Sequence, residues 1–417
     1  MRLFSLLFAL TLCWPASWLL CESAHGQSYC VDLKNTLMPA SGAMGGTSVA
    51  RPQDFISGIN GNAATLTQYR GTNFTVGSAW AEATMNIDQT GNVPLPGITP
   101  FSAKSQTPGS AVPNVGVAQE LTAYGLPVTL GMALVGAAGA GTDFRQVSES
   151  NGTSMYLSIL EFAPSAAVQL TERLSVGSTF FVGSGFLDGP FVGDGAMTNA
   201  YGLRASLGMS YALSDDTTLG AYYQTRQHFR FEDAVRIELL NGQFEDSRDV
   251  ELELPRSVGL GIANSSLMGG DLLLAADVLY MNWEDADLFR DVYRDQWVLQ
   301  LGSQYQLTKR CKLRAGYSLA QNPIDSSTGT SVAGIPIPGG VPGVKYLQAQ
   351  LAVVGEHRIS GGIGFSDVLP GVDFDVMAGG MFPASEQLGA NTAVNLESYW
   401  AGMGLTWRFG RGACAAE

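Results

Sequence analysis

The feature that most constrains the fold of this chain is a strict alternation of residue types in its C-terminal two thirds. Apolar side chains occupy nearly every second position from Tyr201 to Leu213, and the positions between them carry Gly202, Arg204, Ser206, Gly208, Ser210 and Ala212. The same period of two recurs over 297–307 and 313–319. Successive side chains of a β-strand point to opposite faces, so each segment predicts a strand with one apolar face. That face packs in the core of a soluble sandwich or contacts lipid in a membrane barrel.

The composition favours the membrane alternative. The 417 residues are 46% hydrophobic and only 14% charged, and after the first 26 residues no apolar run reaches the roughly twenty residues of a transmembrane helix. Within lipid, only helices and closed barrels satisfy all of their backbone groups. The sequence therefore predicts an all-β fold, a transmembrane antiparallel β-barrel.

The first residues predict export. Arg2 precedes an apolar run from Leu3 to Leu20, and the small-residue stretch Ala24–Gly26 is a plausible cleavage site. Residues 1–26 are thus interpreted as a cleaved signal peptide. The alternative is a membrane anchor, but Pro15 interrupts an already short run.

The spacing of the alternating segments predicts about fourteen strands. They are expected near 72–84, 112–121, 126–139, 153–170, 173–184, 198–212, 218–231, 250–263, 270–282, 294–307, 312–321, 346–366, 371–382 and 396–409. Long connections (85–111, 140–152, 185–197, 232–249, 283–293, 322–345 and 383–395) alternate with tight ones such as Leu213–Thr217. This pattern is typical of a barrel in the bacterial outer membrane with both chain ends on the periplasmic side.

The last expected strand carries the most specific single pattern. Aromatic and aliphatic residues alternate with small ones from Tyr399 to Phe409. It resembles the terminal strand read by the bacterial barrel-insertion machinery, which becomes an expected partner together with outer-membrane lipid and lipopolysaccharide. The alternative is an ordinary edge strand of a soluble protein. Residues 71–409 are assigned to the barrel and 410–417 to a periplasmic tail.

The segment before the first strand has a different composition. Met38–Gly46 is rich in small residues without a period of two. Residues 27–70 are therefore predicted to form a hatch, or plug, inside the lumen, and a loose tail is the alternative.

Two segments of this region carry a family resemblance, Gly42–Ala50 and Ile59–Leu66. Further matches follow in order at 164–177, 219–225, 254–261, 277–283 and 314–323. Together they resemble the FadL family of outer-membrane transporters for long-chain fatty acids and other hydrophobic compounds. The resemblance assigns Gly42, Gly45, Gly46, Asn62 and Ala63 to the hatch, although Ala63 stands where the family usually has proline. It implies a fourteen-stranded barrel, a plugged lumen and a kinked third strand that opens a lateral exit into the membrane.

The third expected strand, 126–139, has the residues that such a kink requires. Proline removes a ladder donor and glycine permits bends, so the kink candidates are Pro127, Gly131 and Gly136.

Alternation also predicts which side chains face the lumen. An apolar path for a ligand would be lined by Phe181, Tyr222, Leu273, Leu279, Met281 and Trp283, and packing against the hatch is an equally good interpretation. Inward-facing Arg204, Arg314 and Arg358, with Arg408, could pair with a ligand carboxylate or form ionic networks with Asp and Glu of the lumen. Between two strands, the apolar residues of 288–293 lie among aspartates, which suggests an amphipathic landing site for ligands at the surface.

Other function classes fit less well. The net charge of −14 disfavours nucleic acid. Cys30, Cys311 and Cys414 match no zinc pattern, and the two histidines after the leader lie in no recognisable catalytic motif. We therefore expect a monomeric passive channel for fatty acids or hydrocarbons in the outer membrane, without a cofactor, metal or enzymatic activity. The alternatives are a general diffusion porin and a structural barrel.

Overall fold

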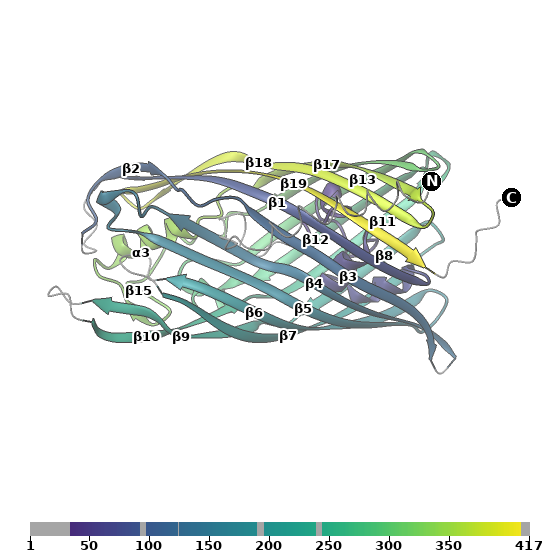
Figure 1. The fold of residues 1–417 in the computed structure, drawn as a ribbon, viewed down its shortest axis with the longest axis horizontal. Coiled ribbons are helices and arrows are strands. Elements are labelled where there is room, and N and C mark those ends of the chain that lie inside the picture. The colour runs from purple at the N-terminus through teal and green to yellow at the C-terminus, as the bar shows by residue number, and fades with distance from the viewer. Residues whose placement is uncertain (1–33, 92–96, 124, 190–195, 239–243, 410–417) are drawn as a thin grey trace, which may run out of the picture.

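The computed structural model describes residues 34–91, 97–123, 125–189, 196–238 and 244–409. They form a closed antiparallel barrel (Figure 1). Its fourteen strands, in order around the wall, are β1 (Thr72–Gln89), β3 (Ser110–Ala123), β4 (Leu126–Asp143), β5 (Ser154–Gln169), β6 (Leu174–Gly189), β7 (Ala196–Ala212), β8 (Thr217–Gln224), β11 (Arg256–Leu267), β12 (Leu272–Asn282), β13 (Gln296–Thr308), β14 (Cys311–Ala320), β17 (His357–Leu369), β18 (Val372–Leu388) and β19 (Thr392–Phe409).

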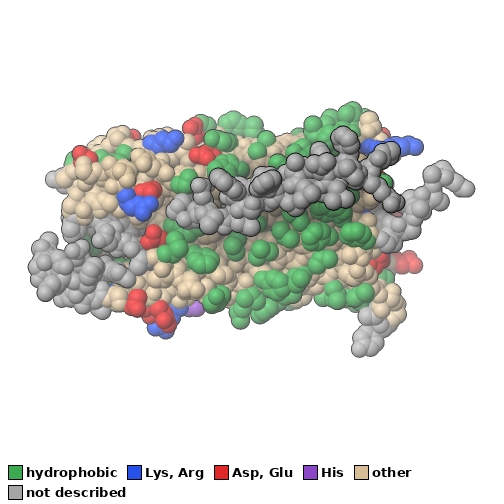
Figure 2. All heavy atoms as spheres, viewed as in Figure 1, with side chains coloured by type: hydrophobic (Ala, Val, Ile, Leu, Met, Phe, Trp, Pro, Cys, Tyr) green, Lys and Arg blue, Asp and Glu red, His purple; other side chains and the backbone are tan. Residues whose placement is uncertain are grey.

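The last strand closes the ring onto the first. β19 pairs with β1 without interruption, from Phe409 opposite Thr72 to Thr392 opposite Gln89. The apolar face of the alternating segments points outward, and Tyr201, Leu203 and Leu207 are 72%, 57% and 63% exposed. Hydrophobic side chains gather along the middle of the outer surface, whereas most charged ones lie toward the two ends (Figure 2). The outer face is thus suited to lipid, and the predicted transmembrane barrel is confirmed.

The two ends of the barrel differ. Tight turns such as Leu213–Asp216 and Pro370–Gly371 occupy the end where β19 finishes, which we call the turn end. The longer connections occupy the other end, the loop end. There lie the short strand β2 (Phe101–Lys104) and the hairpins β9 (Gln227–Glu238) with β10 (Phe244–Leu254) and β15 (Ser331–Val332) with β16 (Ile335–Pro336), together with the helix α3 (Val341–Gln350).

Four expected segments have wrong boundaries. The strand expected at 346–366 begins only at His357, because residues up to Gln350 belong to helix α3. Pro342 occupies the first turn of this helix, a position that needs no N–H donor. The long loop expected at 383–395 shrinks to residues 389–391, since β18 continues to Leu388 and β19 begins at Thr392. The strands expected at 218–231 and 250–263 each join a wall strand, β8 or β11, to a strand of the separate β9–β10 hairpin.

The plug lies inside the barrel near the turn end (Figure 1). Residues 34–70 contain a 3-10 helix η1 (Gly42–Met44), the α-helix α2 (Phe55–Asn60) and a second 3-10 helix η2 (Ala63–Gln68). Residues 35–50 and 55–67 are all buried, which confirms a hatch in the lumen. The predicted signal peptide, Cys30, the first residues of the predicted hatch and the tail with Cys414 lie outside the described residues.

The described residues include no helix that is long and apolar enough to cross a membrane.

Candidate functional site

The plug rests directly on the backbone of the barrel wall. Inward-facing glycines of eleven strands contact it and form what we call the glycine belt: Gly77, Gly116, Gly131, Gly177, Gly208, Gly220, Gly261, Gly302, Gly316, Gly362 and Gly404. A Cβ atom at Gly208 would lie 2.0 Å from Asn62 Oδ1, and one at Gly316 would lie 1.9 Å from the Gly45 nitrogen. Only glycine permits the plug backbone to approach the wall backbone this closely, so the wall fits the plug around most of its circumference.

Polar contacts also fix the plug. The carboxylate of Asp277 in β12, which is 1% exposed, accepts hydrogen bonds from the backbone nitrogens of Ser48 (2.6 Å) and Val49 (2.9 Å). Asn62 donates to the carbonyl oxygens of Val49 (2.7 Å) and Met209 (2.8 Å). Of these bonds, the two to the Asp277 carboxylate are the stronger kind, because an ionised acceptor strengthens a hydrogen bond. Asp277 therefore anchors the plug to the wall.

The remaining predicted hatch residues lie in the same contact zone. Gly45 and Gly46 adopt φ angles of 73° and 89°, which favour glycine, and a Cβ at Gly42 would lie 2.4 Å from the Thr36 carbonyl oxygen. Ala63 packs with its backbone on Gly177.

The six predicted path residues all point inward, but into different surroundings. Phe181 packs with the plug residues Phe55, Ile56, Ile59 and Leu66, and Leu273 packs with Met44 and Ala50. Tyr222, Leu279, Met281 and Trp283 belong instead to a large apolar cluster, the loop-end cluster, which also includes the plug residues Leu37, Ala43 and Val49. The Lys34 ammonium of the plug lies 5.9 Å from the centre of the Tyr222 ring. Phe181, Leu273 and Tyr222 thus lie against the plug, whereas Leu279, Met281 and Trp283 lie in the cluster beyond it.

Arg204 and Arg314 are engaged in ionic networks. Arg204 makes a buried bidentate pair with Glu161, with nitrogen–oxygen distances of 2.7 Å, and its guanidinium lies 4.9 Å from the centre of the Phe181 ring. Arg314 pairs with Asp375 and donates to Gln304 at 2.8 Å. Arg358 is 5% exposed on β17.

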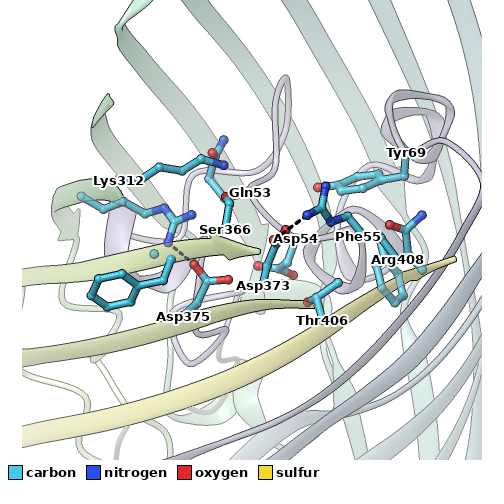
Figure 3. Close-up of a pocket in the computed structure, with 14 residues that line it drawn as sticks. Gln53, Asp54, Phe55, Tyr69, Lys312, Ser366, Asp373, Asp375, Thr406 and Arg408 are labelled. Carbon is cyan, nitrogen blue, oxygen red and sulfur yellow. Dashed lines mark hydrogen bonds and ion pairs between the residues drawn. The ribbon is translucent and has the colours of Figure 1, made fainter. Parts of the chain in front are cut away.

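Arg314 belongs to a polar cavity of about 220 Å³ at the turn end (Figure 3). The plug contributes Gln53, Asp54, Phe55 and Tyr69 to its lining, and the wall contributes Lys312, Asp373, Asp375 and Arg408. Arg408 pairs with Asp373 at 2.8 Å and with Asp367 at 2.6 Å. This cavity is ionic, and it lies on the side of the plug opposite to the loop-end cluster.

The loop-end cluster fills the lumen above the plug. The segment after β12 turns into it through the 3-10 helices η5 (Trp283–Asp285) and η6 (Phe289–Asp291). Phe289 and Tyr293 stack at 5.4 Å and both pack edge-on against Trp283. The predicted surface landing site at 288–293 is therefore wrong, because its apolar residues are at most 4% exposed. Alternation with aspartates cannot distinguish a helix face that covers a lumen from one that meets a membrane.

The ladder between β3 and β4 ends before β4 does. It runs regularly from Leu126 opposite Ala123 to Val135 opposite Asn114 and then stops, whereas the pairing of β4 with β5 continues to Asp143. Pro113, the next residue of β3, has no N–H to donate. Residues 136–143 thus lie beyond the β3–β4 ladder, and we call them the bulged segment.

A β-bulge marks the start of the bulged segment. Gly136 pairs with Leu160 and Ala138 with Ile159, so Ala137 is one extra residue. Before the bulge, outward Leu130, Met132 and Leu134 are 45%, 42% and 40% exposed; after it, Ala137, Ala138 and Ala140 are 2%, 4% and 1% exposed. The three alanines join the loop-end cluster. The regular outward exposure of β4 therefore ends at the bulge beside Gly136, while Pro127 and Gly131 lie in regularly paired backbone.

One group of potential metal ligands lies at the loop end among the described residues. Ligand atoms of His228, Glu253 and Asp287 lie within 4.8 Å of one another. Arg226 pairs with Glu253 at 3.2 Å and Arg290 with Asp287 at 2.9 Å. Both carboxylates are already neutralised, so the group is an ion-pair network.

The comparisons with known proteins agree with this architecture. The family model described as outer membrane protein transport protein (OMPP1/FadL/TodX) matches residues 193–338. The chain resembles this family. The matched residues include four of the segments that carry the resemblance, 219–225, 254–261, 277–283 and 314–323. The two hatch segments lie outside the match.

Solved structures share the FadL-like fold. The Pseudomonas putida toluene transporter TodX is 18% identical with a TM-score of 0.66, over 90% of this chain and 99% of that one. A Pseudomonas aeruginosa FadL homologue is 14% identical with a TM-score of 0.68, over 89% and 98%. The Ralstonia pickettii toluene transporter TbuX is 18% identical with a TM-score of 0.62, over 89% and 98%. No curated protein matches the chain. At identities this low, the similarity shows a shared fold and nothing more.

Sequence reasoning missed three features of the candidate site. The anchoring role of Asp277 and the extra residue Ala137 both depend on partners far away in the sequence. The placement of helix α3 in the mouth is a third, and the unbroken apolar run Leu351–Val354 after it was the only local sign that a lipid-facing strand did not start there.

Proposed function

We propose that this FadL-like chain is an outer-membrane channel through which small hydrophobic molecules diffuse passively from the loop end into the membrane. They leave the lumen sideways, between β3 and β4. The observation that carries the proposal is the end of the β3–β4 ladder at Val135, directly beside the loop-end cluster.

The fixed plug favours a lateral route over an axial one. To pass straight through, a molecule would have to displace a plug that touches the glycine belt on eleven strands and is held by Asp277. It would then cross the ionic cavity at the turn end. An apolar molecule gains about 0.8 kcal/mol for each buried methylene and would lose it there. The end of the β3–β4 ladder beside the bulged segment offers a shorter path, bordered by alanine and glycine, between an apolar cluster and lipid.

The state of the arginines favours uncharged ligands. Arg204 and Arg314, two of the three residues predicted to pair with a ligand carboxylate, already pair with carboxylates of the wall. A fatty acid would have to break such a pair, which is costly for buried ions. Hydrocarbons have no such requirement. The structural neighbours TodX and TbuX are described as toluene transporters, and CymD, at 17% identity and a TM-score of 0.61, as a monoaromatic hydrocarbon channel.

Removing the bulge tests the lateral exit. Deletion of Ala137 lets Gly136 and Ala138 follow each other without changing the register with β5, so the ladder with β3 can continue. We expect toluene uptake by proteoliposomes to fall at least tenfold. Deletion of Pro383 is the matched control, because Phe382 and Pro383 form a similar bulge opposite Glu397 in the β18–β19 pair. Unchanged uptake after deletion of Ala137, in a protein that still shows folded-barrel mobility on gels, would refute a lateral exit at β4.

A second variant blocks the same place without altering the backbone register. Around Gly139, a Cβ atom would meet only the Leu157 carbonyl oxygen, at 4.0 Å, so the Cβ of Gly139→Phe fits without a clash and its ring adds bulk beside the proposed exit. Gly189→Phe in β6 is the control, with one neighbour at 3.9 Å. We expect only the first to reduce toluene uptake. Liposome swelling in sugars separates the other classes: fast, unselective sugar influx would identify a general diffusion porin, and a barrel that passes neither sugar nor toluene would be structural.

A further inference from the structure

The hairpin of β9 and β10 continues the hairpin that β8 and β11 form in the wall. β8 pairs with β11 up to Gln224 opposite Ser257, and β9 pairs with β10 from Gln227 opposite Leu254. The two pairs share one register, but they belong to different sheets. The interruption lies at Pro255, which has no N–H to donate to a ladder. The long hairpin therefore has a natural hinge where it leaves the wall.

The part of the hairpin beyond this hinge, residues 227–235 with 247–254, has two different faces, and we call it the flap. One face belongs to the loop-end cluster through side chains that are at most 3% exposed: Phe229, Phe231, Ala234, Val250, Leu252 and Leu254. The other face is exposed and charged, with Arg230, Glu232, Asp249 and Glu251. The flap thus covers part of the loop-end cluster and separates it from water.

The flap lies against the inner side of the wall on a set of glycines. Gly202 of β7 stands between two outward residues and therefore faces inward. A Cβ atom there would lie 2.6 Å from the His228 carbonyl oxygen and 2.9 Å from the Phe229 ring. One at Gly185 of β6 would lie 3.0 Å from the Phe231 ring. The wall is thus fitted to the flap in this closed position.

Glu253 fastens the base of the flap to residues 283–291, which we call the η5–η6 segment. Its backbone nitrogen donates to the Asp287 carbonyl oxygen at 3.1 Å, and the Asp287 nitrogen donates to Glu253 Oε2 at 3.3 Å. The same oxygen lies 3.2 Å from Arg226 Nη1, which also donates to the Asp285 carbonyl oxygen at 2.9 Å. Glu253 is only 8% exposed. Its carboxylate therefore joins the hinge, the flap and the η5–η6 segment in one set of contacts.

We propose that the flap is the entrance for hydrophobic molecules and that Glu253 is a positioning residue that holds this entrance closed. A molecule reaches the loop-end cluster between the flap and the η5–η6 segment when the contacts of Glu253 open. This inference rests on the proposed function and adds an entry step to it.

The two faces of the flap explain why the entrance would respond to apolar molecules. Exposure of the inner face to water is unfavourable, so the flap stays closed without a ligand. A hydrophobic molecule that slides beneath the flap replaces the lost contacts with its own apolar surface. A strongly hydrated solute does not replace them, because it would lose its own hydrogen bonds to water. The contacts of Glu253 are the part of the closed state that an apolar ligand does not replace, so they limit the rate of opening.

A thiol beneath the flap tests the positioning role without relying on transport. Leu252→Cys is introduced into the full chain with its five cysteines changed to serine, and the rate of labelling by a small methanethiosulfonate reagent is measured. We expect Glu253→Gln to raise this rate at least fivefold, because the side chain keeps its size and loses its charge. Glu251→Gln, on the outer face of the same strand, is the matched control and should leave the rate unchanged. Equal rates in the two variants would show that Glu253 does not hold the flap.

Toluene uptake distinguishes a positioning role from a structural one. Without the added thiol, Glu253→Gln should take up toluene into proteoliposomes at least threefold faster than the wild type. A variant that only weakened the fold would lose uptake together with folded-barrel mobility on gels. Unchanged or slower uptake in a protein with normal mobility would contradict the role of the flap as the entrance.

A reversible lock tests the entrance itself. A ring nitrogen of His228 and a carboxylate oxygen of Asp287 lie within 4.8 Å of each other, so His228→Cys and Asp287→Cys can be joined by a short, cleavable methanethiosulfonate cross-linker. We expect uptake to fall at least tenfold in the locked protein and to recover when reductant cleaves the cross-linker. Thr75→Cys with Thr406→Cys is the control pair, because these hydroxyls lie 2.8 Å apart in the β1–β19 seam.

The outcomes separate this inference from the proposed function. If the locked protein takes up toluene as fast as the reduced one, the flap is not the entrance, and Gly139→Phe tests the lateral exit independently. If the lock blocks uptake and Gly139→Phe does not, the exit at β4 is wrong and the entrance beneath the flap is supported.

Discussion

Replacement of Asp277 by leucine is expected to loosen the plug without opening the barrel wall. The carboxylate is buried, and it accepts hydrogen bonds from the backbone nitrogens of Ser48 and Val49 at 2.6 and 2.9 Å. A hydrogen bond contributes about 0.5–1.5 kcal/mol net, so losing two costs about 1–3 kcal/mol of plug docking energy. At about 1.4 kcal/mol for each factor of ten, the population of plugs detached at this point rises roughly 5- to 10²-fold.

Hydrogen exchange of the plug measures this change directly. The amides of Ser48 and Val49 should lose protection by a similar factor in Asp277→Leu, while amides of the β1–β19 seam keep theirs. Asp277→Asn keeps one acceptor oxygen and should show an intermediate loss. Asp271→Leu, at an exposed turn near the start of the same strand, is the control. If exchange at Ser48 and Val49 in Asp277→Leu stays within threefold of the wild type, Asp277 is not what holds the plug.

Three further variants probe the packing of the lumen. Gly208→Val places a branched side chain where the Cβ alone would lie 2.0 Å from Asn62 Oδ1. We expect the temperature at which the folded band is lost on gels to fall by roughly 2–4 °C or more, which corresponds to about 2 kcal/mol in a chain of this length. Glu161→Leu leaves the buried Arg204 without its carboxylate partner and should lower the free energy of unfolding in urea by about 3–5 kcal/mol. Adding Arg204→Met should restore most of that free energy. Trp283→Ala removes the centre of an aromatic group and should cost about 3–5 kcal/mol in the same assay, with no loss of the bound plug.

The barrel was predictable because lipid imposes a simple rule on its wall. Every second residue of β7 faces lipid and is therefore apolar. The alternation from Tyr201 to Leu213 reveals this from the strand's own sequence, without reference to the strands beside it. The rule fails where a segment is covered by protein on all sides. Residues 351–354 are apolar because they are buried at the mouth of the barrel, and so short a run does not distinguish that burial from a fully buried strand.

For the candidate site, the sequence predicted which face of the barrel wall each side chain is on, but not what each side chain contacts. Alternation placed Phe181 and Trp283 on the inner face correctly. It could not show that Phe181 packs on the plug while Trp283 lies in the loop-end cluster, because the height of the plug depends on contacts between distant segments. The bulge at Ala137 is of the same kind: one extra alanine in a strand of small residues leaves no mark in the sequence.

The glycine belt has a consequence for biogenesis. A folded plug that touches the wall backbone on most strands leaves no clearance through which it could slide into a finished cylinder from either end. The plug precedes β1 in the chain, and the ring closes only when β19 meets β1. Residues 34–70 therefore have to lie between the strands before β19 pairs with β1, and the barrel closes around a plug that is already in place.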